Sequence, residues 1–216
     1  MPDRLSRLAP LTGVLFAGLT VASFVLSNNS PDPKSSGRRV IHFYEAHQSS
    51  QRASDLLLAL AVVFLLFFAG SLRGYLRRTP AAEPLSAVVL AAGVLLAAGL
   101  ALFAGMDFAL ADVPSHLDPA AAQAMNVLNS DLFIPTSTGG CAFGIASGLA
   151  ILRGARLPKW LGWVAILIGI ITVTPAAIVG LLGFIVWTVV VSLLIWRRGG
   201  ADKLGQAPAT PDPAAT

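Results

Sequence analysis

Three aspartates stand beside long apolar stretches of this chain, where a carboxyl group could mark a functional site. Asp107 lies near the end of one stretch, while Asp55 and Asp131 stand at the starts of two others. If these stretches lie in lipid, such carboxyl groups are costly and by default mark a functional site. All three are within a turn or two of the expected water interface, however. Capping and pairing, for example of Asp55 with Arg52, are therefore the simpler interpretation.

The histidines share two polar segments with further acids, which suggests a metal or proton site. These residues are His42, Glu45, His47, Asp112, His116 and Asp118. His42 and Glu45 share a helical face, but His47 lies about 140° away at 100° per residue. The sequence contains no HExxH spacing, GxSxG elbow or Walker loop. It therefore predicts no metal site, no cofactor and no catalytic residue.

The elements that must hold these side chains are six apolar stretches, close to the roughly 20 residues that cross a bilayer. They are residues 8–26, 56–76, 85–108, 132–152, 160–174 and 177–196. Hydrophobic residues make up 55% of the chain and charged residues only 12%. A helix satisfies its own backbone hydrogen bonds in lipid. The expected fold is all-α, a single polytopic transmembrane bundle of six helices over residues 1–198, followed by a disordered cytoplasmic tail, residues 199–216.

Lysine and arginine residues predict the orientation. Eleven of the 15 basic residues precede the first stretch, follow the second and fourth, or lie in the tail. The positive-inside rule makes these segments cytoplasmic, with both termini inside and the histidine-bearing loops outside the cell membrane. The first external loop is an exception, since it carries Lys34, Arg38, Arg39 and Arg52. The basic pI of about 9.8 thus reflects topology, and no nucleic-acid partner is expected.

The first stretch has a second interpretation. Arg4 and Arg7 precede an apolar core that ends at Ser27, as in a secretory signal peptide with its cleavage site. The core is longer than that of a usual signal peptide, so we expect it to remain as a helix. The single cysteine, Cys141, lies in the fourth stretch and excludes an intrachain disulfide.

The first external loop contains a short helical pattern. Val40, Phe43, Tyr44 and His47 lie on one face at spacings of three and four. A helix of this kind suits the outer membrane interface, with Tyr44 at headgroup level. Ser54 is then the expected N-cap of the second span.

Prolines mark further boundaries. Asp118 followed by Pro119 predicts the start of a helix that leads into the fourth span. Pro135 predicts a bend in that helix. Thr174 and Pro175 predict a tight outer turn, because one helix over residues 160–196 would be about 55 Å long.

Small residues recur every four positions in the third and fourth stretches. One ridge contains Gly93, Ala97, Ala101 and Gly105, and the other Thr136, Gly140, Gly144 and Gly148. Such ridges let helix backbones approach closely in lipid. We expect both ridges inside the bundle, with packing against each other or a homodimer contact as further interpretations. The polar run of residues 136–138 would suit a solute path, although Ser and Thr more commonly bond to carbonyls of their own helix.

Five short segments carry a family resemblance. They are Gly13-Val14-Leu15-Phe16, Phe43-Tyr44-Glu45-Ala46-His47, Phe67-Phe68-Ala69-Gly70-Ser71-Leu72-Arg73, Asp118-Pro119 and Leu157-Pro158-Lys159-Trp160-Leu161-Gly162-Trp163. Over nearly the whole chain except the tail, the sequence resembles a family of uncharacterised bacterial six-helix membrane proteins, common in actinobacteria and described as a domain of unknown function. The resemblance implies the same topology and no established activity. A shared ligand site would consist of Tyr44, His47 and Arg52 at the outer mouth, with Asp107 as their partner.

The sequence favours a non-enzymatic membrane protein that binds a lipid, a small ligand or a partner protein. The first alternative is a small-solute transporter or permease component that uses Asp107 and residues 136–138. The second is a membrane-embedded enzyme with His42, His47 and His116 near the outer surface. The expected partners are the lipid bilayer and a second copy or another membrane protein.

Overall fold

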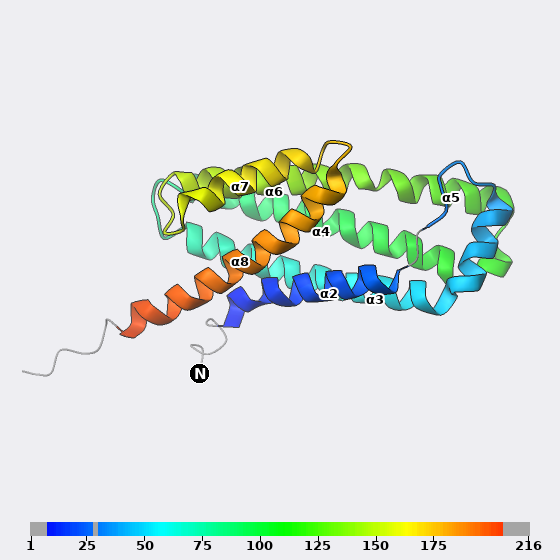
Figure 1. Cartoon of the computed structure of the whole chain (residues 1–216), viewed down its shortest axis with the longest axis horizontal. Helices are drawn as coiled ribbons and strands as arrows, with labels where there is room; N and C mark the ends of the chain where they lie inside the picture. The colour runs from blue at the N-terminus through cyan, green and yellow to red at the C-terminus, as the bar shows by residue number, and fades with distance from the viewer. Residues whose placement is uncertain (1–7, 28–29, 205–216) are drawn as a thin grey trace, which may run out of the picture.

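The computed structural model describes residues 8–27 and 30–204, and the regular elements of these residues are all helices (Figure 1). In chain order they are η1 (Ala9–Leu11), α2 (Thr12–Leu26), α3 (Gly37–Leu76), α4 (Glu83–Asp112), η2 (Pro114–His116), α5 (Pro119–Asp131), α6 (Phe133–Leu152), α7 (Lys159–Ile171) and α8 (Ala177–Leu204). The two η elements are single 3-10 turns. The prediction of an all-α bundle is confirmed for the described chain.

Five helical segments are long and apolar enough to cross a membrane. They are Ala9–Leu26, Gly37–Leu76, Glu83–Asp112, Pro119–Leu152 and Ala177–Arg198. α7, the counterpart of the predicted stretch 160–174, has only 13 residues and is about 20 Å long. It ends early because residues 172–176 already form the turn around Pro175, and a residue before proline avoids the helical conformation. The long helices indicate a membrane protein.

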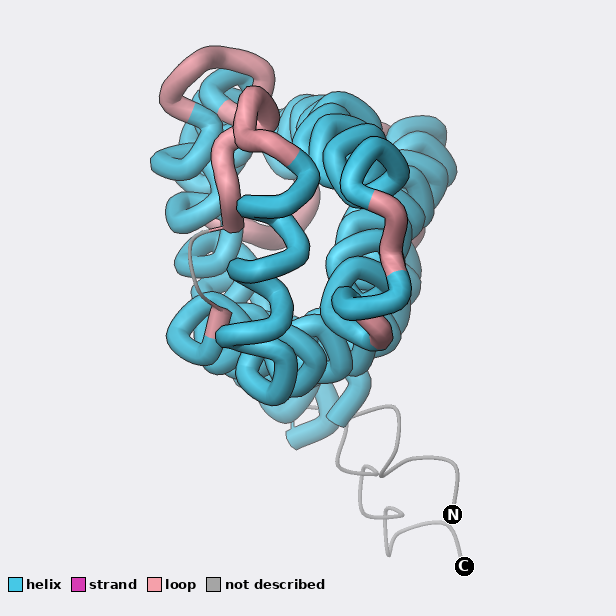
Figure 2. Tube along the Cα trace, turned by 90° about the vertical axis from the view of Figure 1, so that its right-hand side faces the viewer, coloured by secondary structure: helices cyan, strands magenta, loops and turns pink. Residues whose placement is uncertain are grey.

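The chain runs back and forth along an elongated bundle (Figure 1). α2, α4 and α7 run in one direction, while α3, α6 and α8 return. The start of α2 and the end of α8 lie at the same end of the bundle, opposite α5. Figure 2, seen from the α5 side, shows the helices packed side by side. Residues from the first and second predicted external loops therefore meet at the far end from the described termini.

α3 consists of two helical parts, as the sequence predicted, but they join at His47 and not before Ser54. The backbone of His47 leaves the helical region, with φ −121° and ψ 19°, and the helix kinks there. The part before His47 crosses the end of the bundle, and the part after it runs along the bundle (Figure 1). The predicted N-cap at Ser54 is wrong because the helix continues through this residue. Its hydroxyl instead donates to the carbonyl oxygen of Ser23 at 3.0 Å.

Aromatic side chains fill the middle of the bundle. The rings of Phe16 and Phe143 each contact Phe184, with centroids 6.2 and 5.6 Å apart. Trp187 packs on Phe143 at 6.3 Å, and its indole N–H donates to the carbonyl oxygen of Leu161 at 3.0 Å. These edge-to-face contacts and the indole hydrogen bond tie α2, α6, α7 and α8 together.

Glycines bring α6 and α7 into backbone contact. A Cβ at Gly148 would lie 2.4 Å from the carbonyl oxygen of Gly162, and one at Gly144 would lie 2.6 Å from that of Ala165. Gly140 makes only an ordinary contact, at 3.6 Å, with the turn after α7. The ridge of the fourth stretch therefore packs inside the bundle as predicted, but its partner is α7.

The contact between α4 and α6 uses other glycines. A Cβ at Gly139 would lie 2.4 Å from the backbone of α4, and one at Gly99 would lie 2.8 Å from the backbone of α6. Gly93 lies between α3 and α6, because a Cβ there would be 2.8 Å from Ala69 and 3.1 Å from the ring of Phe143. Gly105 is exposed and has no described atom within 4 Å of a built Cβ. The closest approach of α4 and α6 thus lies beside the predicted ridges, although Gly93 of one ridge contacts Phe143 of α6 and Thr136 of the other contacts Gly99 of α4.

The boundary signals around α5 agree with the structure. The carboxylate of Asp118 accepts hydrogen bonds from two backbone N–H groups of the first turn, at 2.8 and 3.4 Å, and α5 begins at Pro119. Leu132 separates α5 from α6, three residues before Pro135. Proline cannot donate to the carbonyl four residues before it, so the helix is interrupted at this point.

The ends of the chain are only partly described. α8 continues to Leu204, so residues 199–204 are helical where a disordered tail was predicted. The rest of that tail, residues 205–216, and the basic residues Arg4 and Arg7 lie outside the described residues. Within α2, Phe16 is fully buried in the core, so the first stretch contributes to the packing of the bundle.

Candidate functional site

Asp107 is the centre of a buried polar cluster at the α5 end of the bundle. Its carboxyl group is 3% exposed and accepts three hydrogen bonds. The hydroxyl of Tyr44 and the side-chain amide of Asn129, the latter at 3.0 Å, donate to Oδ1. The side-chain amide of Gln51 donates to Oδ2 at 3.2 Å. These three hydrogen bonds hold the carboxyl group of Asp107 between α3 and α5.

Helical spacing in α3 places three members of the cluster on one side. Tyr44, Gln51 and Asp55 follow one another at intervals of seven and four residues, which return to the same helical face. All three are at most 4% exposed. The kink at His47 lies between the first and the second of them. It turns the first part of α3 across the end of α4, so that Tyr44 reaches the carboxyl group of Asp107.

The carboxyl group of Asp55 lies within hydrogen-bond reach of that of Asp107. A hydrogen bond between two carboxyl groups needs a proton on one of them, so the pair consists of an acid and a carboxylate. Asp107 already accepts three donors, which leaves Asp55 as the acid. No described hydroxyl or amide donates to Oδ2 of Asp55, although this atom is buried. Asp55 therefore has an oxygen available for a further ligand.

That available side chain lines a cavity of about 70 Å³. The cavity is bounded by Ser23, Phe24, Ser27, Ser30, Gln51, Ser54, Asp55, Leu58, Phe103 and Asp107. Ser30 is exposed and Ser27 half-buried, whereas Ser23 and Ser54 are buried and hydrogen-bonded to each other at 3.0 Å. The cavity thus joins surface residues to Asp55, and it is large enough for a few water molecules or one small ion.

Two of the four predicted ligand residues meet in this cluster, namely Tyr44 and Asp107. Arg52 instead pairs with Asp112 at 3.3 Å, with both side chains nearly half exposed. The ring of His47 bonds to the backbone carbonyl of its own helix, four residues earlier, at 2.9 Å. The predicted pairing of Arg52 with Asp55 is therefore wrong, because Arg52 reaches Asp112 at the surface while Asp55 is buried beside Asp107.

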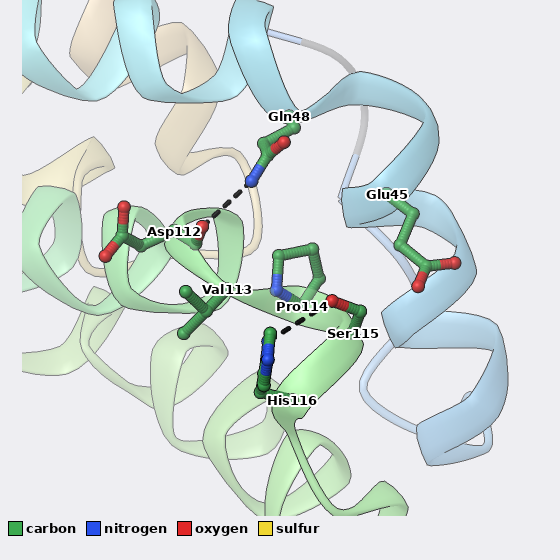
Figure 3. Close-up of a pocket in the computed structure, with 7 residues that line it drawn as sticks. All are labelled: Glu45, Gln48, Asp112, Val113, Pro114, Ser115 and His116. Atoms are coloured by element: carbon green, nitrogen blue, oxygen red, sulfur yellow. Dashed lines mark hydrogen bonds between the residues drawn. The ribbon is translucent and has the colours of Figure 1, made fainter.

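Figure 3 shows a second, more open cavity of about 400 Å³ at the same end. Its walls come from α3, through Glu45 and Gln48, and from the segment from Asp112 to His116. The side-chain amide of Gln48 donates to the carbonyl oxygen of Asp112 at 2.8 Å, which closes one side. Among the described residues, no group of three or more His, Cys, Asp and Glu side chains is placed to hold a metal ion.

The polar run of residues 136–138 does not form a continuous lining. Thr136, Ser137 and Thr138 each donate to the carbonyl oxygen four residues earlier in their own helix, at 3.0, 2.7 and 2.9 Å. Three consecutive residues also point to different sides of a helix. Thr138 is exposed and Ser137 buried. The expected solute path through this run therefore has no support in the geometry.

Gln51, Asp55 and Asn129 were not predicted as members of the site. The spacing from Tyr44 to Gln51 and Asp55 was a usable signal, since three polar residues on one face of a long helix require polar neighbours. Asn129 gave no comparable signal, because its helix, α5, contains several other polar residues. Asp131, the third acid considered from the sequence, is exposed and lies outside the cluster.

Comparisons of the chain with protein-family models, with curated proteins and with solved structures found no match. What the site binds must therefore be inferred from its own chemistry. That chemistry is a hydrogen-bonded carboxylate, a second carboxyl group with a free oxygen, and a small cavity bounded by serine hydroxyls.

Proposed function

We propose that this chain is a non-enzymatic, multi-pass protein of the cytoplasmic membrane that binds a small cation from the outside. The cavity beside Asp55 is the binding site, and Asp107 holds it in place. The observation that carries this proposal is the free oxygen of Asp55, which is buried in a membrane bundle and faces a cavity that reaches the surface. Two carboxyl groups in contact cost stability, and such groups within membrane segments are retained where they bind or transfer ions.

The orientation in this proposal has both termini in the cytoplasm. Its support is the bias of lysine and arginine toward the segments at one end of the bundle. That end includes residues 77–82 and 153–158, while the polar cluster lies at the opposite end. Many large apolar side chains on α2, α3, α4 and α8 are exposed, among them Val25, Leu56, Leu102 and Val186, and they suit contact with lipid. We also propose that the chain belongs to the bacterial membrane-protein family that its sequence resembles. A second copy of the chain or another membrane protein is its proposed partner.

Binding is better supported than transport through the bundle. Away from the polar cluster, the core contains the aromatic rings of Phe16, Phe143, Phe184 and Trp187. It also contains buried hydroxyls without a described hydrogen-bond partner, those of Thr20, Ser147, Thr188 and Ser192. A cation that left Asp55 toward the cytoplasm would meet these neutral hydroxyls but no further buried acid among the described residues. An outward-facing site that binds and releases its ligand on one side needs no such passage.

Thiol labelling tests this proposal directly. In a Cys141→Ala background, which has no other cysteine, Ser27→Cys places a thiol in the cavity wall. A small cationic methanethiosulfonate reagent on intact cells is expected to react several-fold faster than an anionic reagent of similar size, because the cavity contains carboxyl groups. Ala81→Cys, in the exposed loop between α3 and α4, is the matched control for the cytoplasmic side.

Three results would refute the proposal. Labelling of Ser27→Cys only after permeabilisation would reverse the orientation. Equal rates for the cationic and the anionic reagent, unchanged when Asp55→Asn is added, would show that the cavity does not attract cations. Labelling of Ala81→Cys in intact cells would likewise contradict the topology.

A further inference from the structure

We propose that the cavity beside Asp55 binds a single sodium ion, which takes the place of the proton on the Asp55 carboxyl group. This inference rests on the proposed function and names its ligand. The polar side chains around the cavity offer oxygen atoms: the hydroxyls of Ser23 and Ser54, the carboxyl of Asp55 and the amide of Gln51. Oxygen donors of this kind suit hard cations rather than soft transition metals.

The charge of the site selects a monovalent ion. Both oxygens of Asp107 already accept hydrogen bonds, from Tyr44, Asn129 and Gln51. Asp55 alone therefore offers an oxygen without a donor, and this carboxyl group becomes anionic once its proton leaves. A divalent ion would need Asp107 as a second anionic ligand, and that would break the bonds of three buried donors. The cavity, at about 70 Å³, also has room for one ion with little of its water.

Sodium binding leaves the net charge of the cavity unchanged. Without the ion, the proton of Asp55 bridges the two carboxyl groups; with it, Asp55 is a carboxylate and the proton passes to water. The other titratable groups that face Asp55 are Asp107 from α4 and Tyr44 from α3. α2 and α5 contribute only neutral side chains to the cluster, namely Ser23 and Asn129. Sodium and protons therefore compete for one position.

Thermal unfolding of the purified full-length chain in detergent tests the assignment. Chloride salts of sodium, potassium and choline are compared at equal concentration and constant pH. Saturating sodium is expected to raise the midpoint by roughly 5 °C over choline, with little effect of potassium. Sodium added to a weakly buffered sample is expected to release protons. Lowering the pH should raise the sodium concentration that gives half of the stabilising effect.

Variants separate the site from general salt effects. Asp55→Asn keeps a hydrogen bond to Asp107 and removes the anionic ligand, so it should fold and lose the sodium response. Ser54→Ala should fold and require more sodium for half the effect. Asp112→Asn, which alters an exposed acid outside the cavity, should respond like the wild type.

The assignment is overturned if sodium and choline give the same midpoint, if potassium acts as strongly as sodium, or if Asp55→Asn keeps the sodium response. If Ser27→Cys still reacts faster with the cationic reagent but sodium has no effect on the midpoint, the outward-facing cation site stands and sodium is rejected as its ligand. Loss of that preference would reject the proposed function itself.

Discussion

Replacing Asp107 by alanine would remove the acceptor that three buried donors share. Tyr44, Gln51 and Asn129 would each lose a hydrogen bond in a site from which water is largely excluded. Hydrogen bonds between helices of membrane proteins contribute roughly 0.6 to 1.7 kcal/mol each. Three of them predict a loss of about 2 to 5 kcal/mol in the free energy of unfolding. Asp107→Asn keeps the shape and an acceptor for the two donors at Oδ1, so we expect a smaller loss, about 1 kcal/mol.

The assay is thermal unfolding in detergent, followed by the fluorescence of the four tryptophans. Asp107→Ala should lower the midpoint by roughly 5 to 15 °C. Asp112→Ala is the matched control in the same helix, because it removes only an exposed ion pair with Arg52, worth about 0.5 kcal/mol. The reasoning about the cluster would be refuted if the two alanine variants had the same midpoint, or if Asp107→Asn were as unstable as Asp107→Ala.

The same unfolding assay checks three further predictions. Gly148→Ala should lower the free energy of unfolding by about 1 to 3 kcal/mol, since its Cβ would lie 2.4 Å from the Gly162 carbonyl oxygen. The control Gly105→Ala should be neutral or slightly stabilising. Equal midpoints for the two variants would contradict the α6–α7 contact. Asp118→Ala should lower the free energy of unfolding by about 1 kcal/mol, because it removes the cap of α5. Asp118→Asn should keep most of that free energy, because its side chain can still cap the helix. Trp187→Phe should cost about 1 to 3 kcal/mol, through the lost indole hydrogen bond and the smaller ring; a change below 0.5 kcal/mol would count against that packing.

The polar cluster and the kink of α3 depend on each other. Tyr44 lies before the kink at His47, and Gln51 and Asp55 lie after it. Their common partner, Asp107, therefore holds the crossing part of α3 against the part that runs along the bundle. A ligand that changes the charge of Asp55 would act next to this hinge-like point. The cavity, the kink and α5 thus form one structural unit at the end of the bundle opposite the described termini.

Local features of the sequence predicted much of the fold. The apolar lengths gave the long helices, since backbone groups in lipid must be paired within each segment. The cap at Asp118 and the turn near Pro175 were also predicted, because both depend on residues a few positions apart. The break in α3 was misplaced to Ser54. A polar segment can end a helix or continue it, and here packing of Val40 and Tyr44 against the end of α4 keeps it helical.

The sequence by itself determined that the chain is helical and apolar enough for a membrane, and it contained the acids and Tyr44 that form the site. Only the tertiary structure decided which of them meet. Asp107 bonds to residues 63, 56 and 22 positions away, and these pairings depend on how helices are rotated and shifted against one another. Contacts such as that of Gly139 with α4 set this register. Helical periodicity fixes the faces of one helix, but the energy that selects the opposing face comes from packing between helices.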